Sequence, residues 1–193
     1  MTAKLSDIAT IQFGYYDAPS EEGELYYLQA KHFDDTSEFT RFDDSFIPLD
    51  EKSQKHILQP GDILLAGKGY RLFAWHYQGQ PSPAVASTVF FVISAKDNDQ
   101  VLPTYLTTFL NLPQTQTYLR QLGAGTSIPS IRKNELSDLS VPVPSLTMQH
   151  NVAQIQALHQ RETALLTSLI TQKQILIENL IKRLIHAPSE ESS

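Results

Sequence analysis

The feature that most constrains the fold of this chain is a stretch without proline or glycine that runs from residue 147 to residue 185. Its apolar residues recur at steps of three, four and seven positions, which places them on one face of an α-helix. This apolar stripe consists of Val152, Ile155, Leu158, Leu165, Leu169, Leu176, Leu180 and Leu184. The helix is about 50 to 60 Å long at about 1.5 Å per residue, which is longer than a domain of this size can cover. The sequence therefore predicts a long coiled-coil helix over residues 147–186, and a second copy of the chain is the simplest partner for its stripe.

Three polar residues, His159, Glu162 and Lys173, interrupt the stripe. Polar groups in a helix seam cost stability and fix the register of the pairing. The alternative is a helix at the solvent edge that packs on its own domain, since an amphipathic stripe indicates burial without identifying the partner. Residues 187–193 are polar, and we expect them to be disordered.

Residues 1–146 have a different sequence pattern, in which short apolar runs alternate with Gly, Pro, Asn and Asp. This pattern predicts a mixed α/β (α+β) globular domain without regular β-α-β spacing. Strands are expected at residues 26–28, 63–65, 73–77, 88–93 and 139–143. Helices are expected at residues 102–110 and 114–122, with a short third helix that Ser130 caps and that ends at Ser137.

The absence of cysteine excludes disulfide bridges, cysteine–zinc sites and thiol nucleophiles. Apolar residues make up 41% of the chain, which is enough for one hydrophobic core. No stretch approaches the roughly 20 apolar residues that a membrane span needs, and the N-terminus lacks the apolar core of a signal peptide. We therefore expect a cytoplasmic protein.

The net charge of −6 argues against nucleic-acid binding, because phosphate contacts need Lys and Arg. The charge is unevenly distributed. Residues 1–60 contain 12 acidic and 5 basic residues, whereas residues 61–150 contain 5 acidic and 6 basic ones. Any DNA-binding face should therefore draw its bases from the middle of the chain. The acidic group of the first third is expected to be a solvated face or a contact with a partner protein; it consists of Asp34, Asp35, Glu38, Asp43 and Asp44.

Motifs for catalysis are weak. The histidines do not pair with one another or with carboxylates at a metal-binding spacing. Residues 67–69 are too short for a phosphate-binding loop and lack the Ser or Thr that follows it. Asp43 and Asp44 with Lys52 or Lys55 come nearest to the clustered carboxylates and lysine that a nuclease needs. We predict no catalytic residue and no metal site.

Three landmarks appear in order along the chain. The first is LSDIA at residues 5–9, followed by Ile11 and Gly14, and the second is LQPGDIL at residues 58–64. The third is GTSIPSI at residues 125–131, continued by LSDL and VPVPSL up to residue 146 and then by Met148 and Gln149. In this order, the landmarks resemble the specificity subunits of type I restriction–modification enzymes. The closing run, which leads straight into a long helix, is the most specific of the three.

The resemblance implies a function and a set of partners. A full-length subunit of the family has two recognition domains and two long helices, which form an antiparallel coiled coil that acts as a ruler on a split DNA target. This chain has one of each, so the resemblance implies that two copies assemble on a symmetric target, or that the chain pairs with a different half-subunit. The subunit itself is not catalytic. It docks DNA methyltransferase subunits and, in complete systems, a restriction subunit, and these partners bind AdoMet and ATP.

The first candidate cluster for contacts with double-stranded DNA lies in the middle of the chain, where bases and aromatic residues alternate. It consists of Lys68, Tyr70, Arg71 and His76, in an expected β-hairpin of a shape that fits the major groove. The neighbouring Trp75 and Tyr77 are as readily explained as core residues of a half-buried strand.

The second candidate cluster combines hydroxyl groups at an expected helix start with two bases, an arrangement that commonly binds phosphate. It consists of Thr126, Ser127, Ser130, Arg132 and Lys133. Gln12 and Tyr15 follow the first landmark and are expected on the same face. A continuous band of bases across the two clusters would favour DNA binding, whereas their scatter over separate faces would favour the alternative, a scaffold or inhibitor that assembles with the family's subunits without binding DNA.

Overall fold

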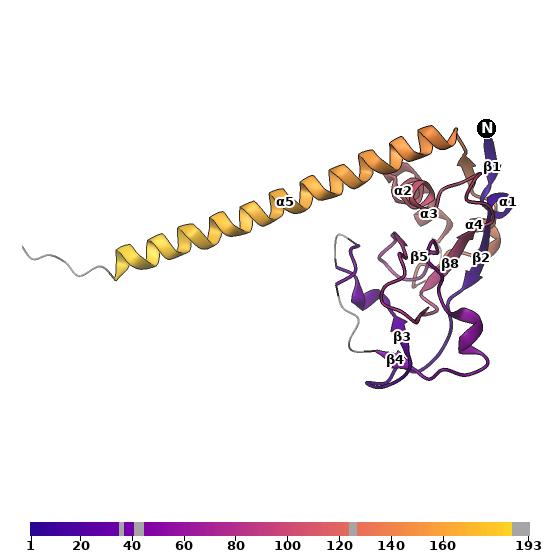
Figure 1. Ribbon diagram of the computed structural model, residues 1–193, viewed down its shortest axis with the longest axis horizontal. Coiled ribbons are helices and arrows are strands. Elements are labelled where there is room, and N and C mark those ends of the chain that lie inside the picture. Colours follow the sequence, from indigo (N-terminus) through magenta and orange to yellow (C-terminus); the bar gives the residue numbers. More distant parts are fainter. Residues whose placement is uncertain (35–36, 41–44, 124–126, 187–193) are drawn as a thin grey trace, which may run out of the picture. The chain divides into compact units, whose positions relative to one another are not determined.

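The computed structural model describes residues 1–34, 37–40, 45–123 and 127–186 (Figure 1). The chain divides into two compact units, Met1–Ala153 and Gln154–Ser193. The boundary falls inside the last helix, α5 (Leu146–Ile185), so its first two turns belong to the N-terminal unit. The expected class, a mixed α/β domain followed by one long helix, is confirmed. The expected disordered tail at residues 187–193 lies outside the described residues.

The N-terminal unit is built around an antiparallel sheet of four strands in the order β2-β8-β5-β6. Its strands are β2 (Ala9–Phe13), β5 (Ile63–Ala66), β6 (Ala74–His76) and β8 (Phe90–Ala95). Strand β5 is buried on both faces, because Ile63 and Leu65 point into one hydrophobic cluster and Leu64 and Ala66 into another. This explains why its sequence is an unbroken apolar run.

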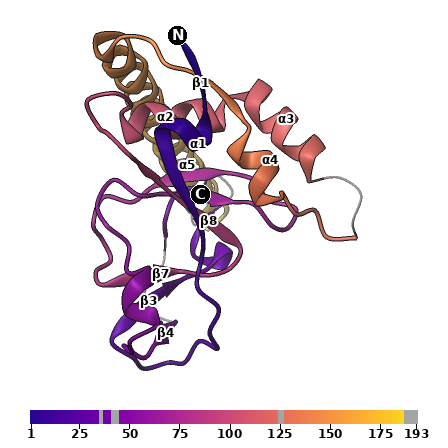
Figure 2. The same ribbon diagram turned by 90° about the vertical axis from the view of Figure 1, so that its right-hand side faces the viewer.

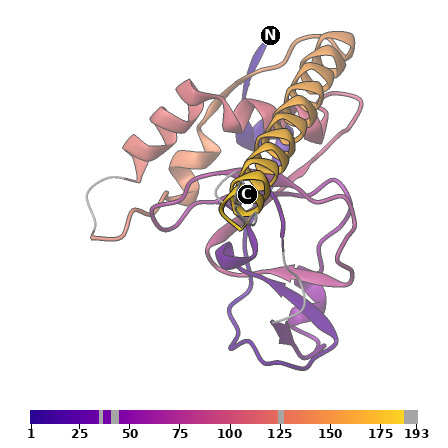
Figure 3. The same cartoon turned by 90° about the vertical axis from the view of Figure 1, so that its left-hand side faces the viewer.

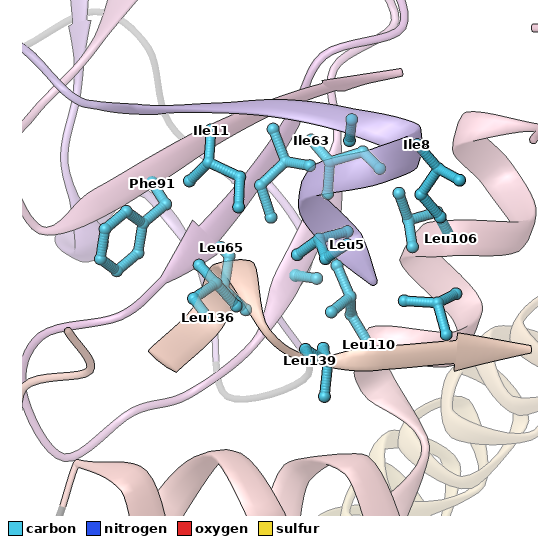
Figure 4. Packing of buried hydrophobic residues seen from close by; sticks show 14 of the residues in the cluster. Leu5, Ile8, Ile11, Ile63, Leu65, Phe91, Leu106, Leu110, Leu136 and Leu139 are labelled. Carbon is cyan, nitrogen blue, oxygen red and sulfur yellow. The ribbon is translucent and has the colours of Figure 1, made fainter. Parts of the chain in front are cut away.

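The first hydrophobic cluster joins the sheet to the helices (Figure 4). Leu5 and Ile8 from α1 (Leu5–Ile8) meet Ile63 and Leu65 there, and Leu106 and Leu110 come from α2 (Pro103–Asn111). Two further helices, α3 (Pro113–Leu122) and α4 (Lys133–Ser137), contribute Leu119 and Leu136 to it. In Figure 2 these four helices lie at one end of the unit.

The second cluster lies between the central sheet and a three-stranded sheet in the order β4-β3-β7. Strands β3 (Leu25–Leu28) and β7 (Ala84–Ala86) are parallel, and β4 (Phe46–Ile47) pairs with β3 in the antiparallel sense. Figures 2 and 3 show this small sheet at the end of the unit opposite the four helices. Two 3-10 helices, η1 (Ala30–His32) and η2 (Ser53–His56), follow β3 and β4 in the chain.

The two ends of the N-terminal unit are paired. Strand β1 (Thr2–Lys4) is antiparallel to β9 (Ser140–Pro142), and the amide of Val143 donates to the carbonyl oxygen of Met1 at 2.7 Å. The first turns of α5 therefore start next to the N-terminus. Among the described residues, no helix is long and apolar enough to span a membrane.

Several expectations need correction. Ser130 does not cap α4, which begins three residues later at Lys133 with Arg132 as its N-cap; Ser130 instead forms a β-bridge with Lys68. The strand expected at residues 88–93 starts only at Phe90, because the residues before it form a turn. Tyr77 is core and Trp75 is half-buried, so the alternative explanation of these two aromatics is correct. Val152 packs against the core of the N-terminal unit rather than extending the exposed stripe.

Candidate nucleic-acid interface

The two candidate clusters of the sequence are brought together by a pair of loops. The amide of Ile131 donates to the carbonyl oxygen of Gly67, and the amide of Gly69 donates to that of Pro129, both at 2.8 Å. Residues 67–70 and 127–131 therefore run side by side, with Lys68 opposite Ser130. The hydroxyl group of Tyr70 closes the pair by donating to the carbonyl oxygen of Ser127 at 3.0 Å. Thr126 lies outside the described residues.

Two glycines make this loop pair possible. A Cβ on Gly67 would lie 2.4 Å from the ring of Phe91, so a larger residue would displace that ring. Gly69 has a φ of +104°, a conformation that other residues rarely adopt. The pattern Gly-Lys-Gly is thus a backbone requirement that leaves the side chain of Lys68 exposed.

A cavity of about 200 Å³ opens beside the loop pair. Its walls include Lys68, Thr88 and Ser130, whose side chains are exposed, and the ring of Phe13. The ammonium group of Lys133 lies 6.0 Å from the centre of that ring, within the range of a cation–π contact. We use the name Lys68 cavity for the lining residues Lys68, Thr88, Ser130 and Phe13 together with the adjacent Lys133, which is not itself a lining residue. The lining contains one cation, two hydroxyl groups and no acidic residue, and Lys133 adds a second cation at Phe13, so the group is suited to bind phosphate.

The four bases whose continuous band would favour DNA binding are divided between different contacts. Lys68 and Lys133 both lie at Phe13. Arg132, next to Lys133 in the chain, forms an exposed ion pair of 3.7 Å with Glu135. Arg71 is engaged by its own domain, because its guanidinium group donates to carbonyl oxygens of residues 30–34.

His76 lies in β6 opposite Ile63 and is half-buried. Burial lowers the pKa of its imidazole, which therefore favours the neutral form. A neutral, partly covered ring offers less to a phosphate than an exposed cation would.

Gln12 and Tyr15 lie away from the Lys68 cavity. Neighbouring residues of a strand point to opposite faces, so Gln12 and Phe13 do not share a face of β2. Gln12 lines a different cavity, of about 190 Å³, together with His56 and Asp62. The ring of Tyr15 lies 5.0 Å from that of His56, and partial desolvation raises the pKa of the Tyr15 hydroxyl.

Asp62 has a structural role in its turn. Its carboxylate accepts hydrogen bonds from the amide of Gln59 at 2.7 Å and from the hydroxyl group of Ser94 at 2.5 Å. Gly61, beside it, has a φ of +102°. The second landmark of the sequence is therefore explained by a hydrogen-bonded turn that enters β5. Among the described residues, no group of three or more His, Asp or Glu is arranged to hold a metal ion.

Sequence reasoning did not identify Phe13 and Thr88 as candidates. Phe13 reaches the cavity because β2 pairs with β8 and places it opposite Phe91. Thr88 lies in the turn before β8. Neither position carries a local signal, because both depend on pairing between segments that are distant in the sequence.

Residues 1–178 match the family described as the type I restriction modification DNA specificity domain. No curated protein sequence matches the chain. The S subunit of a type I restriction–modification system from M. genitalium is similar in structure, with a TM-score of 0.64 and 14% identity over 98% of this chain and 46% of that one.

Two further structures are similar. The HsdS subunit from Thermoanaerobacter tengcongensis has a TM-score of 0.63 and 16% identity, over 100% of this chain and 51% of that one. A chain from a study of complex assembly and conformational transition of the type I R-M system has a TM-score of 0.61 and 16% identity, over 93% of this chain and 43% of that one. The chain thus spans about half the length of these neighbours, and at these identities the likeness shows the fold.

Proposed function

Because the chain belongs to the type I restriction–modification DNA specificity family, we propose that it recognises a specific sequence of double-stranded DNA and contributes no catalytic group of its own. The observation that carries this proposal is the Lys68 cavity. Lys68 lies in the loop after β5 and Lys133 is the first residue of α4, 65 positions further along the chain, yet both lie at the Phe13 ring. In a chain with a net charge of −6, two cations gathered without an acidic lining residue indicate a site for phosphate.

The proposed functional unit contains two chains. The apolar stripe from Ile155 to Leu184 is exposed along α5, and burying it against a second copy gives a closed two-fold assembly. Each copy then presents one recognition domain, so the DNA target is split and symmetric. In this proposal the stripe residues Ile155, Leu158, Leu165, Leu169, Leu176, Leu180 and Leu184 form the dimer seam.

The proposed partners are a DNA methyltransferase subunit and, in a complete system, a restriction subunit. These partners would bind AdoMet and ATP, and the chain would bring them to the DNA. Methyl transfer to adenine N6 would then mark the sequence that two copies of the chain recognise.

Methylation mapping tests this function. The chain is expressed with its methyltransferase subunit in a host that lacks the modification, and methylated adenines are mapped across the genome. We expect methylation at one bipartite, two-fold symmetric sequence, which a Lys68→Ala, Lys133→Ala double variant reduces. Methylation without sequence preference, or methylation that does not depend on this chain, would contradict the proposal.

A second candidate function is a scaffold or inhibitor that joins the family's assemblies without binding DNA. The acidic first third favours it, since residues 1–60 carry 12 acidic and only 5 basic residues. In that case the chain would co-purify with a methyltransferase subunit and yet leave both methylation and DNA binding of the complex unchanged or reduced.

A further inference from the structure

Phe13 is an apolar ring held at the surface in a basic setting. Its side chain is 54% exposed although it is large and aromatic. Phosphate is bound by charged and hydrogen-bonding groups, to which a phenyl ring adds little. If the Lys68 cavity only held phosphate, the exposed Phe13 ring would therefore add little to the binding.

The ring is also fixed in place. Phe13 pairs with Phe91 across β2 and β8, and the two ring centres lie 5.0 Å apart. The Phe91 ring is in turn packed on Gly67, where a Cβ would lie 2.4 Å from it. A contact made by Phe13 therefore loses little conformational freedom on binding.

The position of Lys133 indicates which contact the ring can make. Its ammonium group lies over the Phe13 ring, 6.0 Å from the centre. A base that stacked on this face would displace the ammonium group, whereas a group that touches the ring edge would not. Edge contact is therefore favoured over stacking on this face.

Among the groups that base pairs present in the major groove, the 5-methyl group of thymine is the apolar one. Building on the proposed function, we propose that Phe13 contacts the methyl group of a thymine in the target while Lys68 and Lys133 hold neighbouring phosphates. Phe13 is then a residue that determines specificity, and the two lysines set its position on the duplex.

Uracil substitution tests this contact, because uracil pairs as thymine does and lacks only the methyl group. The full chain in complex with its methyltransferase is titrated with duplexes of the mapped target, in which each thymine in turn is replaced by uracil. At one thymine of each half-site, we expect about four-fold weaker binding, the size that follows from exposing one methyl group. The Phe13→Ala variant should bind both duplexes equally at that position, and Phe13→Leu should keep part of the difference.

Tyr16→Ala is the matched control. Tyr16 is 83% exposed, lies three residues further along the chain and is absent from the lining of the Lys68 cavity. This variant should keep the full preference for thymine, and thermal unfolding should show that all three variants are folded.

The outcomes distinguish a failure of the methyl contact from a failure of the proposed function. A target that is bound specifically, but at which no thymine preference depends on Phe13, overturns the methyl contact and leaves the proposed function intact. The same conclusion follows if Phe13→Ala weakens binding to both duplexes by the same factor. If the complex binds every duplex without sequence preference, the proposed function itself is wrong.

Discussion

The guanidinium group of Arg71 donates hydrogen bonds to the carbonyl oxygens of Ala30, Phe33 and Asp34 and lies 5.4 Å from the centre of the Phe73 ring. These contacts tie the loop after β5 to the segment after β3. A basic residue two positions after a glycine turn fits a DNA contact in the sequence, but the Arg71 side chain already binds its own domain. Two bases of one short segment therefore differ in role: the Lys68 side chain lines the Lys68 cavity, and the Arg71 side chain is structural.

Replacing Arg71 should consequently affect stability more than DNA binding. We expect Arg71→Ala to lower the free energy of unfolding by about 1–3 kcal/mol, since three carbonyl oxygens lose a charged donor. Arg132→Ala is the control, because its ion pair with Glu135 is exposed and should contribute less than about 1 kcal/mol. Urea unfolding measures both variants. An Arg71→Ala protein of unchanged stability would show that these contacts are not formed in solution.

Lys68 and Lys133 should show the opposite behaviour. Each alanine variant is expected to weaken DNA binding for all sequences alike and to reduce the slope of log affinity against log salt by about 1. Lys52→Ala is the control, because Lys52 lies in the acidic first third, outside the lining of the Lys68 cavity. Binding measured at several salt concentrations by fluorescence anisotropy gives the slopes. If Lys52→Ala changes the slope as much as the other two, the cavity does not hold phosphate.

His76 should make stability depend on pH. Burial lowers the pKa of His76 in the folded protein below its ordinary value of 6.5, which the unfolded chain retains. The unfolded state therefore binds a proton first as pH falls, so stability is full above about pH 6.5 and declines below it until the folded-state pKa is reached. We expect the melting temperature to fall between pH 7.5 and 5.5, and to fall less in His76→Asn. An equal fall in both proteins would assign the pH dependence to other groups.

At the scale of elements, Gln149 anchors the start of α5. Its side chain is fully buried and binds three backbone groups of the N-terminal unit. Its Oε1 atom accepts from the amide of Leu102 at 2.9 Å, and its Nε2 atom donates to the carbonyl oxygens of Gln100 and Pro144 at 3.0 and 2.9 Å. The third landmark of the sequence thus ends in a residue that fastens the helix to the loop before α2.

Removing the hydrogen bonds of the Gln149 side chain should destabilise the folded protein. Gln149→Leu leaves one amide and two carbonyl groups without these partners, and we expect a loss of about 2–4 kcal/mol in the free energy of unfolding. Gln154→Leu makes the same change at an exposed position of the same helix and should stay within about 0.5 kcal/mol of the parent protein. Equal effects of the two changes on the unfolding midpoint in urea would rule out the anchoring role.

The local sequence pattern was sufficient to predict those helices and strands that are defined by their own residues. The apolar run of β5, the proline at the first turn of α2 and the length of α5 each follow from neighbouring residues. Pairings between distant segments could not be derived in this way. The parallel pairing of β3 with β7 and the antiparallel pairing of β1 with β9 join segments that are distant in the sequence.

The candidate site likewise combines residues that the local pattern identified with contacts that it could not predict. Sequence reasoning found Lys68, Ser130 and Lys133 from residue type and turn signals. It assigned Ser130 to a helix cap, because a hydroxyl residue before a helix usually serves as one, whereas the structure pairs it with Lys68. Their meeting at Phe13 needed the β2–β8 register and the loop pair, which no local signal encodes.

At the scale of the whole molecule, the surface of α5 divides into two kinds of face. Thirteen large apolar side chains between Ile155 and Ile185 are exposed by 45–78%, a surface that an isolated chain in water would not be expected to keep open. At about 100° per residue, Thr171 lies on the side of the helix opposite the apolar stripe, and its hydroxyl group donates to the carbonyl oxygen of Thr167 one turn earlier. A partner that covers the stripe leaves Thr171 in solvent.

This division defines a test of the two-chain assembly. At about 100° per residue, Leu165 and Leu169 lie within the apolar face, and Thr171 lies well away from it. We expect the full chain to be a dimer by light scattering after size exclusion, and a Leu165→Glu, Leu169→Glu double variant to be a monomer, because two carboxylates per chain would lie in the seam. Thr171→Glu adds the same group on the polar face and should remain a dimer, while circular dichroism shows whether the helix persists in each variant. A parent chain that is monomeric at high micromolar concentration would contradict the two-chain assembly, and the prediction of a symmetric target would no longer stand.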